Sequence, residues 1–160
     1  MRRVYIETTI PSFYYDTREA EPAPLWRNLT RQWWTNWAPR YHLVTSTFTL
    51  RELAAAPEPK RAEALKLMRA VEILDDPPEL ADVTEFYIQH RLMPADAVGD
   101  AAHLAIASLS RVDFLLTWNL KHLANANKFR QVGVLNARLG LPMPAITTPL
   151  TLSAEGPPDA

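Results

Sequence analysis

The sequence contains no cysteine and only four glycines. Without cysteine the chain forms no disulfide bond, offers no thiolate to a metal and has no cysteine nucleophile. Neither the G-x-G-x-x-G nor the G-x-x-x-x-G-K pattern of a phosphate-binding loop is present. These absences disfavour disulfide frameworks, thiol enzymes and nucleotide-binding proteins.

Long apolar segments and a strong net charge are also missing. No stretch approaches the ~20 apolar residues that span a bilayer, and the opening MRRVYIE lacks the apolar region of a signal peptide. We therefore expect a cytoplasmic protein with no membrane contact. Because the formal net charge is −1, any polyanion must be bound by local basic residues rather than by an overall field.

The composition is that of an ordinary globular domain. Of the 160 residues, 48% are hydrophobic and 22% are charged, which gives no tendency toward disorder. This length suits a single domain with a full core. We expect that domain to span residues 1–148, followed by a flexible tail over residues 149–160.

Short apolar runs alternate with longer segments of helical periodicity along the chain. Strands are expected at 3–7, 41–46, 73–74, 113–117 and 145–148. Helices are expected at 24–37, 47–56, 58–71, 78–92, 95–110 and 126–139. This alternation is typical of βαβ units, so it predicts an α/β fold with a mostly parallel sheet covered on both faces.

Polar side chains follow several of the expected strands. In an open parallel sheet, ligands bind beyond the carboxyl ends of the strands. Glu7 and Asn119 each stand at the end of a strand, Glu52 lies in the helix after the second strand, and Asp100 lies in the helix after Pro94. We expect these four side chains to converge at one edge of the sheet.

The segment 95–110 shows how such convergence works. Asp96, Asp100 and His103 are spaced i, i+4 and i+7, so they share one side of the helix. A neighbouring apolar stripe is expected to face the sheet: Val98, Ala102, Ala105 or Ile106, and Leu109. Gly99 costs ~1 kcal/mol relative to alanine in a helix, which indicates either close backbone approach or simple tolerance.

Clustered carboxylates need a cation. They repel one another and raise each other's pKa unless positive charge lies between them. Oxygen ligands suit magnesium or manganese better than zinc. Such an ion neutralises charge on a phosphoryl group and activates water, which is the chemistry of phosphodiester hydrolysis.

Each candidate also has a structural interpretation. Thr49 and Glu52 fit a capping box, Asp96 suits a helix N-terminus, and a single histidine such as His103 is more often structural than a ligand. The helical spacing of the tryptophans in RNLTRQWWTNW favours core or interface packing over base stacking.

Taken in order, four segments resemble PIN-domain ribonucleases, in particular the VapC-type toxins of prokaryotic toxin–antitoxin pairs. VYIETTIPSFYYD resembles the opening that carries the first acid, and TLREL the segment with the second. GDAAHLAIA is similar to the segment with the third, and FLLTWNLKHL to the strand end with the fourth. The resemblance covers residues 1 to about 148.

This resemblance implies a three-layer α/β/α fold, a Mg²⁺ or Mn²⁺ site, RNA cleavage and inhibition by a cognate antitoxin. Glu7, Glu52 and Asp100 would hold the metal, and Asn119 would occupy the fourth acidic position. Two residues depart from the family pattern. Glu7 replaces the usual aspartate, and its extra methylene moves the carboxylate by ~1.5 Å, while Asn119 carries no negative charge.

Three further residues are candidates for a supporting role. Thr8 and Thr117 lie where their hydroxyls can hydrogen-bond a ligand carboxylate or water, or else satisfy backbone groups at strand ends, and Asp96 lies one helical turn before Asp100.

The sequence therefore predicts a metal-dependent endoribonuclease of the toxin type. An alternative is an RNA-binding or regulatory module that has lost hydrolysis, because of Glu7 and Asn119. A phosphatase is disfavoured, since no DxDx[TV] signal follows the first strand.

Two protein partners are also predicted. A cognate antitoxin is one, and a second copy of the chain in a homodimer is the other. The tryptophan-rich segment RNLTRQWWTNW is the candidate contact surface for either.

Overall fold

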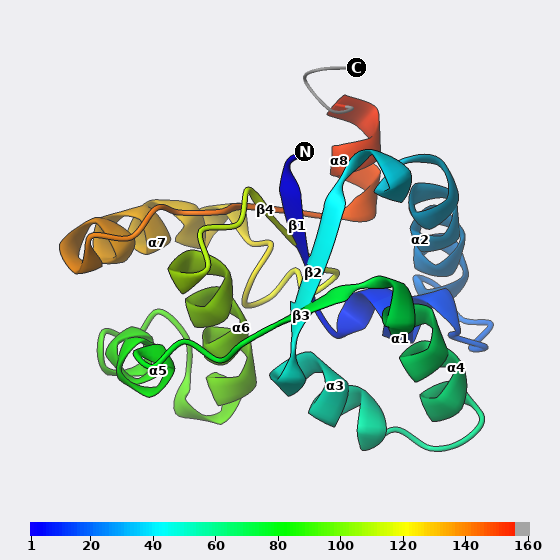
Figure 1. Cartoon of the computed structure of the whole chain (residues 1–160), viewed down its shortest axis with the longest axis horizontal. Helices are drawn as coiled ribbons and strands as arrows, with labels where there is room; N and C mark the ends of the chain where they lie inside the picture. Colours follow the sequence, from blue (N-terminus) through cyan, green and yellow to red (C-terminus); the bar gives the residue numbers. More distant parts are fainter. Residues whose placement is uncertain (156–160) are drawn as a thin grey trace.

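The computed structural model describes residues 1–155 and is built around a five-stranded parallel sheet (Figure 1). The strand order is β3-β2-β1-β4-β5. The strands are β1 (Arg3–Ile6), β2 (His42–Ser46), β3 (Glu72–Leu74), β4 (Phe114–Leu116) and β5 (Ala145–Thr147). The parallel sheet predicted from the alternating pattern is confirmed, and each strand lies within two residues of its expected bounds.

The first strand occupies the centre of the sheet. Tyr5 of β1 pairs with Val44 of β2 on one side and with Leu115 of β4 on the other. β1 is buried on both faces, and this explains why its sequence is a nearly continuous apolar run.

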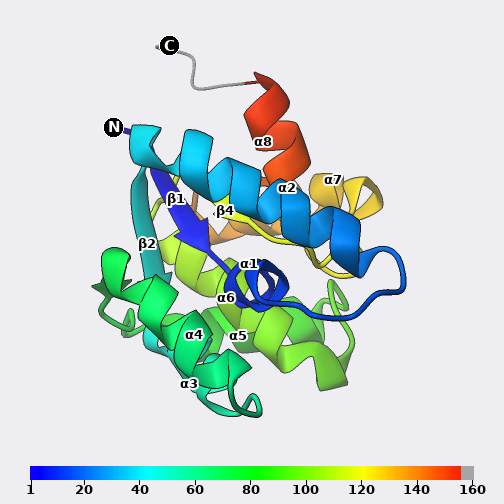
Figure 2. The ribbon, with the colours of Figure 1, turned by 90° about the vertical axis from the view of Figure 1, so that its right-hand side faces the viewer.

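Helices cover both faces of the sheet (Figures 1 and 2). They are α1 (Thr9–Tyr14), α2 (Ala23–Asn36), α3 (Thr47–Ala54), α4 (Lys60–Leu67), α5 (Leu80–Gln89), α6 (Val98–Leu109), α7 (Ala126–Leu139) and α8 (Pro149–Glu155). Short 3-10 turns cover Ala38–Arg40, Met68–Ala70 and Ala95–Ala97. The architecture is the expected three-layer α/β/α arrangement.

The alternation of side chains along β1 divides the core in two. Tyr5 faces a cluster built with α5, α6 and α7. Val4 and Ile6 face the opposite cluster, which includes Ile10 of α1 and Trp33 of α2. Trp33 is fully buried, so at this position the interpretation as core packing is confirmed and base stacking is excluded.

The cap of α3 differs from the sequence prediction. Ser46, the last residue of β2, is the N-cap, and its hydroxyl accepts a hydrogen bond from the Thr49 amide. Thr49 is instead buried inside the helix, and its hydroxyl lies 3.3 Å from that of Tyr5. The prediction of a capping box at Thr49 and Glu52 is therefore wrong. The strand runs directly into the helix, so the N-cap lies three residues earlier, at Ser46.

The buried side of α6 also differs from the expected stripe. Val98 of that stripe is 53% exposed, whereas Ala101 and Leu104, which lie outside it, are fully buried. Every residue from Ala101 to Ser108 is buried because α6 packs against both the sheet and α5. A helix buried nearly all round carries no single stripe that identifies its sheet-facing side.

The chain has a further helix beyond β5. α8 (Pro149–Glu155) packs against α2, and Leu152 is buried in the cluster around Val4 and Ile6. Residues 149–155 are therefore helical, which corrects the expectation of a flexible tail there, and residues 156–160 lie outside the described part of the chain. None of the helices within residues 1–155 has the length and apolar character needed to cross a membrane.

Candidate active site

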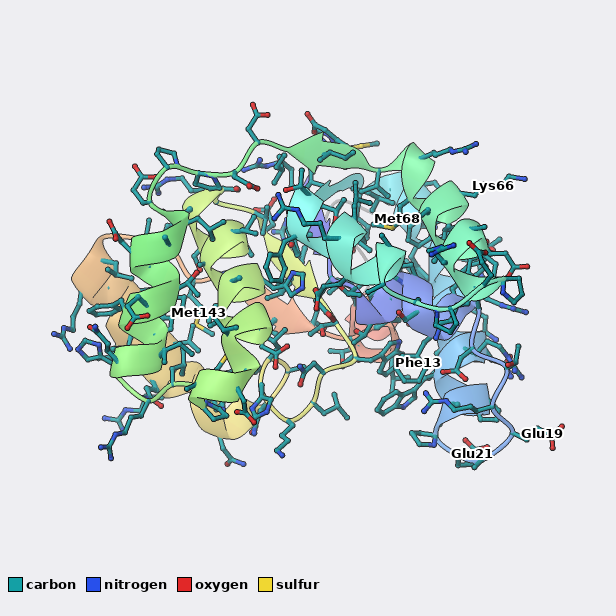
Figure 3. The ribbon with its side chains drawn as sticks, turned by 90° about the horizontal axis from the view of Figure 1, so that it is seen from below. Phe13, Glu19, Glu21, Lys66, Met68 and Met143 are labelled. Atoms are coloured by element: carbon teal, nitrogen blue, oxygen red, sulfur yellow. The ribbon has the colours of Figure 1, made fainter. Side chains whose placement is uncertain are left out.

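A cluster of polar side chains lies at the carboxyl edge of the sheet, where β1, β2 and β4 end. The strand order reverses at β1, because the next strands in the chain, β2 and β3, lie on one side of it and β4 and β5 lie on the other. Such a switch point is where open α/β sheets bind ligands. Figure 3 views the molecule from this edge, with Phe13 marking the side of α1 and α2.

Glu7 follows β1 directly and is buried, with 3% of its surface exposed. Its Oε1 atom accepts hydrogen bonds from the hydroxyls of Thr9 at 2.6 Å and Thr117 at 2.7 Å. The Thr9 amide lies 3.1 Å from both carboxylate oxygens. Oε2 therefore has only a shared amide donor among the described residues and keeps room for another partner.

Burial raises the pKa of Glu7 above its ordinary value, because water is removed from the charged form. The nearby His103 and the donors on Thr117 and Thr9 act in the opposite direction without cancelling the effect of burial. A buried carboxylate of this kind gains from a cation beside its open oxygen.

Glu52 projects from α3 toward the same edge. Thr8 donates a 2.7 Å hydrogen bond to its Oε1 atom, and the Nε2 atom of His103 contacts the same oxygen. Oε2 accepts no hydrogen bond from a described residue, and 40% of the Glu52 side chain is exposed. Glu52 thus belongs to the polar cluster and not to the cap of α3.

The two glutamates differ in the direction of their pKa shifts. Burial works to raise the pKa of Glu52, but the hydrogen bond and charge of His103, together with the Thr8 hydroxyl, outweigh it and hold that pKa below its ordinary value. Glu52 is therefore the more readily ionised of the pair, and Glu7 the more readily protonated.

Sequence reasoning did not assign His103 to this cluster, and it also missed Thr9 and Tyr5. His103 is 1% exposed on α6, and its Nδ1 atom lies 2.8 Å from the Tyr5 hydroxyl. The Tyr5 hydroxyl in turn lies 2.7 Å from the hydroxyl of Ser46. The spacing of His103 three residues after Asp100 was the available signal, but its partner Glu52 is 51 residues away in sequence.

The two aspartates before His103 differ in position. Asp100 lies in the first turn of α6 and is partly exposed, and its carboxylate accepts no hydrogen bond from a described residue. Gly99 places the backbone of this turn near Glu52, since a Cβ at position 99 would lie 3.6 Å from Glu52 Oε2. Asp96 is exposed in the preceding 3-10 turn and joins no contact of the cluster.

Asn119 lies just beyond β4 and is held by its own loop. Its backbone amide donates to the Thr117 hydroxyl at 2.9 Å, and its Oδ1 atom accepts from the His122 amide at 2.9 Å. The Nδ2 group contacts no polar atom of the described residues. Asn119 therefore offers the site a hydrogen-bond donor at the position where the resemblance places the fourth acid.

No family model matches the sequence, and no curated protein does either. Three solved structures are similar in fold. A toxin–antitoxin complex from Klebsiella pneumoniae has a TM-score of 0.59 at 18% identity, covering 91% of this chain and 97% of that one. VapBC2 from Rickettsia felis, bound to a DNA fragment from its promoter, has a TM-score of 0.53 at 13% identity, covering 91% of this chain and 98% of that one. Mycobacterium tuberculosis VapC20, a sarcin-ricin loop cleaving toxin, has a TM-score of 0.55 at 14% identity, covering 74% of this chain and 92% of that one.

The chain has the fold of the VapC toxins. This confirms the PIN-like architecture inferred from the four ordered segments. The identity is too low to carry residue roles across, so the chemistry of the site must be argued from its own side chains.

On this VapC-type fold, Thr9 donates to Glu7 and Thr8 donates to Glu52, and the Oε2 atom of each carboxylate has no side-chain donor among the described residues. Their all-oxygen donor chemistry suits Mg²⁺ or Mn²⁺. Within residues 1–155, however, no three Asp, Glu or His side chains are grouped in an arrangement that could hold a metal ion. The expected metal set of Glu7, Glu52 and Asp100 stays a prediction.

Proposed function

We propose that this protein is a metal-dependent endoribonuclease, the toxin of a toxin–antitoxin pair. One observation carries the proposal. Two carboxylates, Glu7 after β1 and Glu52 on α3, are both held by hydroxyls of the Thr8–Thr9 segment at the carboxyl edge of a VapC-type fold. The similarity to VapC20, a sarcin-ricin loop cleaving toxin, supports RNA as the substrate class.

Glu7, Glu52 and Asp100 are the residues that would hold Mg²⁺ or Mn²⁺. When bound there, the ion would supply the positive charge that a phosphodiester needs as its phosphorus is attacked by water. The carboxylates supply oxygen ligands of the kind that such ions prefer. Asp100 contributes an unpaired, partly exposed carboxylate and follows Gly99, whose backbone lies near Glu52.

The remaining polar residues orient these groups. Thr9 and Thr117 fix Oε1 of Glu7, and Thr8 fixes Oε1 of Glu52, so each carboxylate presents its second oxygen. The free Nδ2 group of Asn119 is a donor for a phosphate oxygen or an attacking water molecule. Side chains held in this way lose little freedom when substrate binds.

The test is cleavage of a mixed RNA substrate by the purified chain, with Mg²⁺ and again with excess EDTA. We expect cleavage only with metal, and a loss of at least ~100-fold in Glu52→Gln. Glu72→Gln is the matched control, because Glu72 is an exposed glutamate that pairs with His42 at the opposite, amino edge of the sheet. Equal cleavage in EDTA would show that the metal dependence is wrong.

The second candidate is an RNA-binding or regulatory module without hydrolysis. It is favoured by the lack of a three-residue metal group among residues 1–155. Calorimetric titration with Mg²⁺ and Mn²⁺ separates the two functions. RNA binding without detectable metal binding or cleavage would support the module.

The proposed partner is a cognate antitoxin. The similar structure from Klebsiella pneumoniae is a toxin–antitoxin complex, which supports a partner of this kind. A small open reading frame beside this one, whose product co-purifies with the chain and suppresses cleavage, is the expected result. A homodimer and a cytoplasmic location remain expectations, and the first is tested by light scattering at several protein concentrations.

A further inference from the structure

Three elements are joined around the second carboxylate by a closed ring of contacts. Ser46 caps the start of α3, its hydroxyl lies 2.7 Å from that of Tyr5 on β1, and Tyr5 lies 2.8 Å from Nδ1 of His103 on α6. Nε2 of His103 then contacts Glu52, six residues along α3 from Ser46. The ring returns to the helix where it began.

The ring determines which oxygen of Glu52 remains available. His103 and Thr8 both engage Oε1, and Oε2 is left open on the side of Gly99 and Asp100. Without these partners a side chain that is 40% exposed would sample several rotamers. With them, Oε1 is anchored, so Oε2 is held beside Gly99.

The imidazole ring itself cannot turn freely. The edge-to-face contact with Phe48 has a centroid distance of 5.2 Å, and that with Tyr5 has 5.7 Å. His103 is 1% exposed and both of its ring nitrogens have polar partners. A histidine needed only for packing would not have to place one nitrogen on a half-exposed carboxylate at the edge of the sheet.

We propose that His103 is a positioning residue for Glu52 and that Tyr5 sets the orientation of its ring. His103 touches neither substrate nor ion in this arrangement and acts through Glu52. This inference rests on the proposed ribonuclease function for its catalytic consequence. The geometric part, that His103 holds the Glu52 carboxylate in one orientation, stands independently of RNA cleavage.

Two substitutions separate the two nitrogens of His103. In His103→Gln the side-chain amide reaches approximately the position of Nε2, so a donor to Glu52 is kept. In His103→Asn the amide reaches only the position of Nδ1, so the contact with Tyr5 is kept and that with Glu52 is lost. Removing an outer partner of a metal-binding side chain costs roughly 10–100-fold in metal affinity or activity.

We expect His103→Asn to lower Mn²⁺ affinity and RNA cleavage by about 10–100-fold and His103→Gln to restore most of both. Tyr5→Phe keeps the buried ring and removes only the hydroxyl, so it tests the same chain of contacts if a His103 variant fails to fold. We expect a smaller loss in the same direction. The proposal would be overturned if His103→Asn cleaved RNA at the wild-type rate, or if folded His103→Gln and His103→Asn lost cleavage to the same extent.

A measurement on metal-free protein makes this test independent of the proposed function. The ¹³C chemical shift of the Glu52 carboxylate reports its hydrogen-bonded partners without RNA or metal. We expect the shift to move in His103→Asn and to stay near the wild-type value in His103→Gln. If wild type does not cleave RNA but this pattern holds, the ribonuclease function fails and the positioning role survives; an unchanged shift in His103→Asn removes the role.

Discussion

The hydroxyl of Thr117 donates a 2.7 Å hydrogen bond to the carboxylate of Glu7 and so joins the ends of β4 and β1. Both residues are buried, and they are 110 positions apart in the sequence. The same hydroxyl accepts a 2.9 Å hydrogen bond from the backbone amide of Asn119. One side chain thus fixes the first carboxylate and the start of the loop that carries Asn119.

Substituting Thr117 by valine tests this junction. Valine has nearly the same shape but no hydroxyl, so Glu7 loses a donor and the Asn119 amide loses its acceptor. We expect a destabilisation of about 1–3 kcal/mol, the usual cost of leaving a buried polar group unpaired, measured by urea unfolding. RNA cleavage should fall by at least ~10-fold in the folded variant, because Glu7 is no longer held.

Thr45→Val is the matched control for that substitution. Thr45 is equally buried, and its hydroxyl donates to the carbonyl of Ile6 at 2.8 Å and to neither carboxylate. A similar loss of stability with cleavage retained is expected. If Thr45→Val and Thr117→Val lose cleavage to the same extent, the effect of Thr117 is general destabilisation and not the position of Glu7.

The raised pKa of Glu7 predicts a pH-dependent stability in metal-free protein. The folded state binds a proton more tightly than the unfolded chain, so the contribution of Glu7 is present below about pH 4.5, its ordinary pKa, and is lost as pH rises through the folded value. Glu7→Gln removes this loss. We expect the melting temperature of Glu7→Gln relative to wild type to increase from pH 4.5 to pH 8 in EDTA. A difference that stays constant or shrinks over this range contradicts the prediction.

Gly99→Ala tests why a glycine stands in the first turn of α6. A Cβ there would lie 3.5 Å from the Phe48 ring and 3.6 Å from Glu52 Oε2, which are ordinary contact distances, and the backbone has no left-handed strain. Alanine is favoured over glycine in a helix by ~1 kcal/mol. We expect a gain of up to about that amount in the free energy of unfolding. A loss of stability would mean that close approach, rather than tolerance, explains the glycine.

Local patterns in the sequence were sufficient for the five strands and for six of the helices, but not for α1 or α8. Alternation of apolar runs and helical segments predicted the parallel sheet, and the strand ends identified Glu7 and Asn119. Ser46 was missed as a cap because Thr49 and Glu52 fit a capping box in isolation. α8 was missed because its burial comes from Leu152 packing into a distant cluster, and its short sequence carries little periodicity.

Contacts between distant segments could not be predicted in this way. The ring through Ser46, Tyr5, His103 and Glu52 depends on where β1, α3 and α6 come together. A buried tyrosine in a strand and a histidine in an apolar helix are each ordinary by themselves. Their roles become visible only when the register of β1 places Tyr5 beneath α6.

Asp100→Asn tests the third predicted metal ligand. The Asp100 carboxylate is partly exposed and accepts no hydrogen bond from a described residue, so its neutralisation should change the free energy of unfolding by less than about 0.5 kcal/mol, as for most surface substitutions. Cleavage should nevertheless fall by at least ~100-fold, because a neutral amide is a much poorer ligand for a hard cation. Guanidinium unfolding and a cleavage assay over a range of Mg²⁺ concentrations measure the two effects.

Asp96→Asn provides the comparison that gives this result its meaning. Asp96 lies one helical turn earlier, is exposed and joins no contact of the polar cluster. Both substitutions remove one negative charge from the same short segment, so a general electrostatic effect on RNA binding would change cleavage equally in the two variants. A loss confined to Asp100→Asn, and partly recovered at high Mg²⁺ or Mn²⁺, assigns the carboxylate to the ion. Full activity in Asp100→Asn would instead leave Glu7 and Glu52 without their third ligand and favour the RNA-binding module.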